Sequence, residues 1–196
     1  MNATAPLFEA DSLLLADDGE GGIVYWPRCL APSACDELFA CLRDGIAWAS
    51  EQRPMYDRIV DVPRLQASIA LAGSGRAAQF ETALDRIRAI APAPYTHVGL
   101  NFYRDGRDSV AMHHDHTQDL VVGAPIAVLS LGAPRDMLVR RRQKGARALR
   151  ITLEPGSVMV MSHASQFTHE HGIPKTTRLV EPRISCAFRA RRREFD

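Results

Sequence analysis

The feature that most constrains the fold is a change of hydrophobic period at Tyr95. Before Tyr95, apolar residues recur at the three- and four-residue spacing of amphipathic helices. After it, apolar and polar residues alternate, as they do on strands that bury one face. Turn signals such as Asp105-Gly106 and Pro155-Gly156 separate the alternating segments. The predicted strands are residues 98–103, 126–131, 137–142, 148–153, 157–161 and 183–189.

The part of the chain before Tyr95 is predicted to contain two helices. Residues 33–45 and 80–91 each place apolar side chains on one face at helical spacing. A short strand is expected at residues 23–26. The polar stretch between the helices, residues 49–76, is expected to be a variable loop near a binding site. Helices followed by antiparallel-looking strands predict an α+β fold, with a β-sandwich or jelly-roll core flanked by two helices.

Length and composition indicate a single globular domain. The chain has 196 residues, and we expect one domain over residues 23–196 after a loosely ordered arm over residues 1–22. No apolar run approaches the roughly 20 residues that span a bilayer, and the N-terminus lacks the pattern of a secretion signal. The cysteines have no zinc-finger spacing and are expected to be reduced. We expect a cytoplasmic monomer with no membrane partner.

His113 and Asp115 form the first candidate site. They are two residues apart, so on an extended segment both side chains leave the same face. Two imidazoles with one carboxylate suit non-haem Fe(II), which keeps open positions for a co-substrate and O₂. An isolated His-x-Asp can also be a polar loop after a strand. The candidates for the missing third ligand are His97, His163, His169 and His171.

The segment 183–189 forms the second candidate site. In a strand its even-numbered residues make an apolar face, whereas Arg183, Ser185 and Arg189 face the other way. Arginines on an inner face are costly unless an anion pairs with them. Two long side chains whose Cα atoms are roughly 20 Å apart could hold a small dicarboxylate between them. The alternative is an edge strand with exposed arginines.

Asn101 and Tyr103 share one face of the predicted strand 98–103. An amide and a phenol can both hydrogen-bond a carboxylate, so these two residues could serve the same anion. The alternative is a strand whose polar face meets solvent.

Together these residues resemble the AlkB family of Fe(II)- and 2-oxoglutarate-dependent dioxygenases. The resemblance covers roughly residues 95–190 and follows the order of the family's motifs. These are an Asn-x-Tyr strand with a glycine turn, a His-x-Asp, a strand ending in Gly-Ala-x-Arg, a late His before a small residue, an aliphatic residue and Pro, and a closing Pro-Arg-x-Asn-x-x-x-Arg. The matching residues are Asn101, Tyr103, Gly106, His113, Asp115, Gly132, Ala133, Arg135, His171, Gly172, Ile173, Pro174, Pro182, Arg183 and Arg189.

The resemblance implies a double-stranded β-helix (jelly-roll) core that carries an iron site. In its register Fe(II) is bound by His113, Asp115 and His171, and His169 is not a ligand. The implied reaction oxidises an N-alkyl carbon with Fe(II), O₂ and 2-oxoglutarate, and it yields succinate, CO₂ and an aldehyde.

The resemblance also implies a 2-oxoglutarate site. Arg183 with Tyr103 would hold the distal carboxylate, and Arg189 and Asn101 would lie near the metal-chelating end. Ser185 stands where the family has Asn. The change removes one hydrogen bond to the co-substrate, which a hydroxyl can partly replace.

Two departures from the family concern the substrate. In nucleic-acid repair members the residue two positions after the iron aspartate is usually acidic and contacts the exocyclic amine of a methylated base; this chain has Thr117. The difference favours a neutral, etheno-type adduct over cationic methylated adenine or cytosine. The repair enzymes also carry stacking aromatics after the arginine matched by Arg64, and residues 65–78 contain none. Stacking contributes about 1–3 kcal/mol per base, and Tyr56 or Trp48 could replace it.

The expected substrate is a damaged base in nucleic acid, DNA more than RNA, in a single strand or flipped from a duplex. Basic residues within 140–150 would contact phosphates, although a solvated hairpin is the alternative. The alternative functions are the same chemistry on RNA, a protein side chain or a small molecule, and a non-catalytic binding module. A zinc hydrolase is disfavoured because the histidines lack hydrolase spacing. The predicted substrate contacts are Thr117, Arg135, Tyr56 and Arg64.

Overall fold

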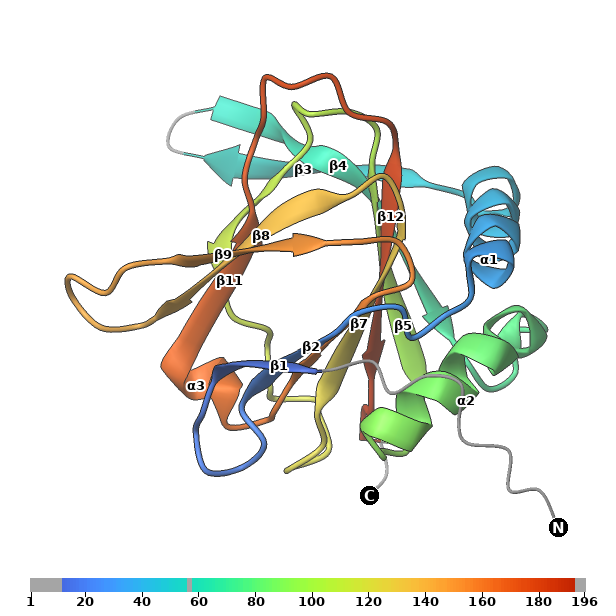
Figure 1. The fold of residues 1–196 in the computed structure, drawn as a ribbon. Coiled ribbons are helices and arrows are strands. Elements are labelled where there is room, and N and C mark those ends of the chain that lie inside the picture. Colours follow the sequence, from blue (N-terminus) through green and yellow to red (C-terminus); the bar gives the residue numbers. More distant parts are fainter. Residues whose placement is uncertain (1–11, 56–57, 193–196) are drawn as a thin grey trace, which may run out of the picture.

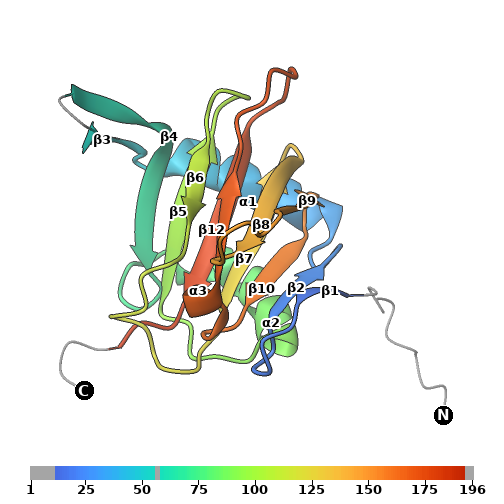
Figure 2. The same ribbon diagram turned by 90° about the vertical axis from the view of Figure 1, so that its left-hand side faces the viewer.

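The computed structural model describes residues 12–55 and 58–192, and it describes side chains for all of these except residues 53–61. This part of the chain forms two antiparallel sheets and a layer of helices (Figures 1 and 2). The strand order is β1-β2-β10-β7-β12-β5-β4-β3 in the larger sheet and β6-β11-β8-β9 in the smaller one. The two long helices, residues 32–45 and 81–90, and the smaller sheet lie on opposite sides of the larger sheet (Figure 1).

The element bounds are as follows. The larger sheet contains β1 (Leu13–Ala16), β2 (Ile23–Trp26), β3 (Ala49–Met55), β4 (Arg58–Ala70), β5 (His97–Tyr103), β7 (Ile126–Gly132), β10 (Val158–Met161) and β12 (Arg183–Arg189). The smaller sheet contains β6 (Val110–His113), β8 (Arg135–Arg141), β9 (Leu149–Leu153) and β11 (His169–Ile173). The helices are α1 (Pro32–Gly45), the 3-10 helix η1 (Ala77–Phe80), α2 (Glu81–Ile90) and the short α3 (Ser165–Thr168).

Strand β12 shows how the two faces of the larger sheet divide. It lies between β7 and β5 and is buried along almost its whole length. Ile184, Cys186 and Phe188 belong to the apolar cluster under α1 and α2, where the Phe188 ring meets the Phe80 ring edge-on at 5.9 Å. The opposite face, toward the smaller sheet, contributes Ala187 to a second apolar cluster. The predicted division of this strand into an apolar and a polar face is confirmed.

The predicted fold class is also confirmed. The two N-terminal helices are present as α1 and α2, and the strands predicted after Tyr95 appear as β5, β7, β8, β9, β10 and β12. The free cysteines form no disulfide among the described residues. Across the same residues, no helix is both long and apolar enough to cross a membrane.

Three stretches differ from the sequence-based expectation. Residues 49–76 contain the β3–β4 hairpin instead of a variable loop, and β4 pairs with β5. A register shift after Ser50 and the proline at Pro63 obscure the alternation of this hairpin. Within the predicted N-terminal arm, Leu13–Ala16 pair with β2, and residues 1–11 lie outside the described residues. Strands β6 and β11 are short, and their alternation is hidden by polar residues.

Candidate metal centre

The smaller sheet brings two of the predicted ligands together. His113 ends β6 and His171 lies in the middle of β11, and the antiparallel register of these strands places the two residues opposite each other. Side chains of directly opposed residues leave the same face of a sheet. The two imidazole rings accordingly lie with their centroids 4.5 Å apart.

Asp115 completes this group from the segment after β6. Its side chain is buried, and its Oδ2 atom lies 3.9 Å from Nε2 of His171. Its Oδ1 atom accepts a hydrogen bond from Arg189. Oδ2 has no hydrogen-bond partner among the described residues. A buried carboxylate oxygen without a partner is costly unless a cation binds it, so this atom points to a missing positive ligand.

The electrostatics keep both groups in the forms that a metal requires. Burial, together with nearby His113, lowers the pKa of His171 to about 4, so its imidazole is neutral at physiological pH. Burial would raise the pKa of the Asp115 carboxyl, but Arg189 and the nearby histidines lower it below its ordinary value. A neutral imidazole and an ionised carboxylate are the ligand forms of these residues.

The tautomer of His113 is set by its own strand. Nδ1 of His113 lies 2.9 Å from the carbonyl oxygen of Ala111, which can only accept a hydrogen bond. Nδ1 is therefore the protonated nitrogen, and Nε2 keeps its lone pair for a metal. Metal-binding histidines commonly donate their second N–H to a carbonyl or carboxylate in this way.

The donor set fits Fe(II), although the described side chains do not close around one point as a group of three ligands. Arg189 donates a hydrogen bond to Oδ1 of Asp115. The other carboxylate oxygen, Oδ2, has no hydrogen-bond partner among the described residues and faces His171. Two imidazoles and one monodentate carboxylate are the facial set expected for non-haem iron.

The other histidines considered as the third ligand make contacts with nearby residues of the chain. The Nδ1 atom of His169 lies 2.9 Å from the hydroxyl of Thr168. His163 meets the ring of Phe167, and His97 contacts the Thr96 hydroxyl. His171, in contrast, lies opposite His113 and 3.9 Å from Asp115, so the geometry favours His171, as the predicted register does.

Candidate co-substrate and substrate residues

Arg183 is the most unusual residue near the centre because it is buried with no carboxylate partner among the described residues. Its Nε atom donates to the hydroxyl of Ser130 at 2.9 Å, and its guanidinium carbon lies 5.1 Å from the centre of the Tyr103 ring. Nη1 and Nη2 have no hydrogen-bond partner among the described residues. Burial lowers the pKa of this group. Two parallel N–H donors held in this way fit a carboxylate, which supports the predicted role of Arg183 and Tyr103.

The other predicted co-substrate residues border the same face. Ser185 is buried and lies in register with Asn101 on β5 and with Ser130 on β7. The Asn101 amide oxygen accepts hydrogen bonds from Arg64 at 2.7 Å and from Gln66 at 3.3 Å. Asn101 therefore presents its amide nitrogen, and not its oxygen, to any further partner.

Arg189 reaches Asp115 by crossing β5 at a glycine. A Cβ atom on Gly99 would lie 2.6 Å from Nη1 of Arg189. A larger residue at this position would therefore require the Arg189 guanidinium to shift. A second glycine, Gly172, lies where a Cβ atom would come within 2.9 Å of the Val110 carbonyl on β6. This close approach explains the small residue after His171.

The predicted substrate contacts lie in different environments in the structure. Arg135 is buried, and its guanidinium donates to the carbonyl oxygens of Asp105, Asp108 and Pro174 at 2.9–3.0 Å. It joins three chain segments. Three of its five N–H donors are used in these contacts, so Arg135 has a structural role beside the predicted substrate contact.

Of the other predicted contacts, Arg64 is buried against Asn101 and the Ser109 carbonyl, so it is a neighbour of the co-substrate residues. Thr117 is half-buried in the segment that follows Asp115. Tyr56 lies outside the described residues. His114 and His116 are exposed, in agreement with the expectation that they are not ligands.

Four residues of the site escaped sequence reasoning. Ser130, Gln66, Gly99 and Gln166 each act through one contact with a residue far away in the chain. Only Gln66 could have been found from the sequence. It lies two residues after Arg64 on β4, so both side chains leave the same face of the strand. Its Oε1 atom is buried without a partner among the described residues.

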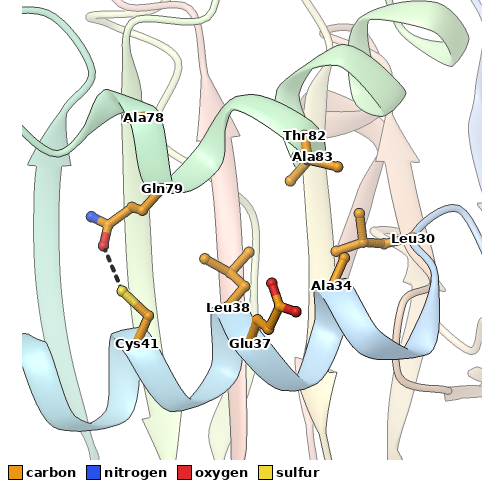
Figure 3. A pocket seen from close by; sticks show the side chains of 9 residues that line it. All are labelled: Leu30, Ala34, Glu37, Leu38, Cys41, Ala78, Gln79, Thr82 and Ala83. Atoms are coloured by element: carbon orange, nitrogen blue, oxygen red, sulfur yellow. Dashed lines mark hydrogen bonds between the residues drawn. The ribbon is translucent and has the colours of Figure 1, made fainter.

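A separate cavity of about 290 Å³ lies between α1 and the η1–α2 segment (Figure 3). Its wall includes Leu38, Cys41 and Gln79, and the Cys41 thiol donates to the Gln79 amide oxygen at 3.2 Å. None of the lining residues belongs to β5, β6, β11 or β12. The cavity is therefore distinct from the candidate metal centre.

Comparison with known proteins supports the class of the site. A family model described as the 2OG-Fe(II) oxygenase superfamily matches residues 74–192. The DNA oxidative demethylase ALKBH2 of Mus musculus is 30% identical over 176 residues, covering 79% of this chain and 74% of that protein. ALKBH2 of Bos taurus is 29% identical over 176 residues, covering 79% of this chain, which spans 63% of that protein's length. The solved structure of OsALKBH1 shares the fold, with a TM-score of 0.64 at 16% identity, covering 86% of this chain and 96% of that one.

The matched region covers more than half of the chain and contains all three predicted ligands, which defines the class as 2-oxoglutarate- and Fe(II)-dependent oxygenases. Within this superfamily the chain belongs to the AlkB family. Membership implies Fe(II) as the metal and 2-oxoglutarate as the co-substrate. The resemblance seen in the sequence is thereby confirmed.

Proposed function

We propose that this chain is a dioxygenase that oxidatively removes alkyl groups from damaged nucleic-acid bases. The observation that carries the proposal is a pair of buried polar groups with unused hydrogen-bonding atoms. Oδ2 of Asp115 faces a neutral imidazole, and Nη1 and Nη2 of Arg183 have no hydrogen-bond partner among the described residues. A divalent cation and a dicarboxylate would satisfy both.

The chain's own residues would orient the reactants. His113, Asp115 and His171 would hold Fe(II), which with O₂ and 2-oxoglutarate supplies the oxidising chemistry. Arg183 would bind the distal carboxylate through Nη1 and Nη2. Arg189 occupies one oxygen of Asp115, which would leave that carboxylate a single oxygen for the metal.

Exposed positive charge near the site supports a nucleic-acid substrate, as do relatives described as DNA oxidative demethylases. In the β8–β9 hairpin, Arg140 pairs with Glu170 and Arg150 with Asp136. Its other basic residues are exposed and form no ion pair among the described residues. These residues are Arg141, Arg142, Lys144 and Arg147. Such a cluster suits a phosphate backbone.

An exposed aromatic residue lies beside this cluster. The Phe167 side chain is 57% exposed, and its carbonyl oxygen accepts a hydrogen bond from Arg142. Its ring contacts His163, with ring centroids 5.4 Å apart, and its chain neighbour Gln166 contacts Asp115. Phe167 offers a stacking surface that is otherwise missing from residues 65–78.

The adduct that the site favours is neutral. Thr117 carries no charge, and the next acid along the chain, Asp119, pairs with Arg191 at 3.2 Å. That carboxylate therefore has its own partner and does not replace the expected acid. We propose that an etheno-type base is a better substrate than a cationic methylated base.

The test is turnover on defined oligonucleotides. Purified protein with Fe(II), O₂ and 2-oxoglutarate is incubated with single-stranded and duplex oligonucleotides that carry etheno or N-methyl bases. Succinate and the mass of each base are measured. Repair of the etheno base, faster than that of the cationic base, is expected. Succinate formed at one rate with every oligonucleotide, and no change in base mass, would exclude nucleic acid and leave a protein side chain or a small molecule. No succinate under any condition would exclude the oxygenase.

A further inference from the structure

Asp115 sits on a segment that has no regular structure of its own. Residues 114–117 follow β6 without joining a strand or helix. A metal ligand must nevertheless be held to within about 0.5 Å of its productive position. Arg189 restrains the carboxylate, but a separate contact is needed to restrain the backbone from which it projects.

That contact is made by Gln166. The amide oxygen of Gln166 accepts the backbone N–H of Asp115 at 3.0 Å, across 51 positions of sequence. Gln166 lies in α3, and its side chain is 2% exposed. An amide is suited to this place because it is a neutral acceptor. A carboxylate here would add a second buried negative charge beside Asp115.

Further hydrogen bonds hold the amide nitrogen of Gln166, on the side away from Asp115. Its Nε2 atom donates to the Ser165 hydroxyl at 3.2 Å, which donates to the Ser162 carbonyl at 2.7 Å. The Ser165 N–H donates to the Ser162 hydroxyl at 2.9 Å, and that hydroxyl donates to Asp18. Ser162 and Ser165 are both buried.

Asp18 anchors the outer end of this chain of hydrogen bonds. Its other carboxylate oxygen accepts the N–H groups of Glu20 at 2.9 Å and Gly22 at 2.7 Å. Asp18 lies between β1 and β2, outside the segment matched by the family model. The hydrogen bonds therefore run without interruption from the turn before β2 to the iron aspartate.

We propose that Gln166 is a positioning residue that aims the Asp115 carboxylate at the metal, and that Ser165, Ser162 and Asp18 hold Gln166 in place. The inference rests on the proposed function only through the role of Asp115 as a ligand. A fully formed polar network of this kind restricts motion because every member has its partners. Loss of the amide oxygen leaves the Asp115 N–H unpaired and the segment free to shift.

The experiment measures metal binding directly. Co(II), which reports ligand geometry through its visible spectrum, is titrated into wild type and into Gln166→Met, Gln166→Glu and Ser165→Ala. Gln79→Met is the matched control, because Gln79 lines the cavity between α1 and α2 and bonds Cys41. The unfolding temperature of each metal-free protein shows whether the variant has folded.

The expected result is a rise of about 10-fold or more in the Co(II) dissociation constant of Gln166→Met, the range typical for residues that orient a ligand. The spectrum should change with it. Gln166→Glu should lose less affinity than Gln166→Met, because its side chain keeps an oxygen that can accept the Asp115 N–H. Gln79→Met should bind as wild type does.

Wild-type affinity and spectrum in folded Gln166→Met would overturn the inference. If that variant does not fold, Ser165→Ala decides: a smaller loss of affinity supports the inference, and no loss overturns it. Failure of the wild type to bind Co(II) would instead refute the proposed function. The two failures are therefore distinguishable.

Discussion

Replacing Arg183 by methionine should not lower the stability of the protein but should greatly weaken its binding of 2-oxoglutarate. The guanidinium is 1% exposed and donates only to Ser130 among the described residues. Methionine fills similar space without a charge. The protein without co-substrate should therefore be no less stable than wild type, because removal of an uncompensated buried charge offsets the lost hydrogen bond to Ser130.

The effect on 2-oxoglutarate should be large. Two charge-assisted hydrogen bonds from Nη1 and Nη2, at about 1.5–3 kcal/mol each, amount to about 3–6 kcal/mol. Since about 1.4 kcal/mol is a factor of ten, affinity should fall by about 10²–10⁴. A ligand at 100 times its Kd stabilises a protein by about 2.7 kcal/mol. For a domain of this size each kcal/mol raises Tm by about 2–4 °C, so the expected rise in Tm is about 5–11 °C.

The assay is thermal unfolding with Mn(II) in place of Fe(II), with and without 2-oxoglutarate. At 100 times the wild-type Kd of 2-oxoglutarate, wild type should show the full rise in Tm, and Arg183→Met should show a rise of at most about 2 °C. Arg140→Met is the matched control, because Arg140 pairs with Glu170 at the surface. An undiminished rise in Arg183→Met would refute the assignment of this residue to the co-substrate.

Three further predictions follow from the same geometry. His171→Ala should lose bound metal and activity, whereas His169→Ala should keep both; the reverse, by metal analysis and succinate assay, would mean that the ligand register is wrong. Gly172→Ala should lower the free energy of unfolding by about 1–3 kcal/mol in denaturant titrations, because its Cβ would press on the backbone of β6; an unchanged midpoint would contradict the close approach. Burial would raise the pKa of Asp18, but hydrogen bonds from Ser162 and two backbone N–H groups lower it below the ordinary 3.8. Its stabilisation is therefore present above that value and lost as the pH falls through the folded pKa, so the stability difference between wild type and Asp18→Asn should close in acid; a constant difference would contradict it.

Much of the sheet could be predicted because alternation is a local property. The strand β12 was bounded correctly at Arg183 and Arg189, since each of its faces has a clear chemical character. The β3–β4 hairpin was missed because Pro63 and a register shift interrupt its pattern. The short strands β6 and β11 were missed because polar residues of the candidate metal centre interrupt their alternation.

The residues of the candidate site likewise include some that the sequence predicted and others whose partners only the structure showed. Spacing predicted that His113 and Asp115 leave one face, and motif order predicted His171 as the third ligand. In the structure the rings of His113 and His171 lie 4.5 Å apart, and Oδ2 of Asp115 lies 3.9 Å from Nε2 of His171. Arg135, in contrast, was expected at the substrate, but its guanidinium is held by three backbone carbonyls. A residue type shows what a side chain can bind, whereas its partners depend on which segments meet.

The sequence by itself determined the class of chemistry, because the ligand types and the order of the motifs that resemble the family can be read along the chain. Only the tertiary structure decided how that chemistry is held in place. It showed that Arg189 reaches Asp115 over Gly99 and that Gln166 holds the Asp115 backbone from 51 positions away. These contacts join residues whose separation along the chain carries no periodic signal, so they exist only once the two sheets and the turn before β2 have packed together.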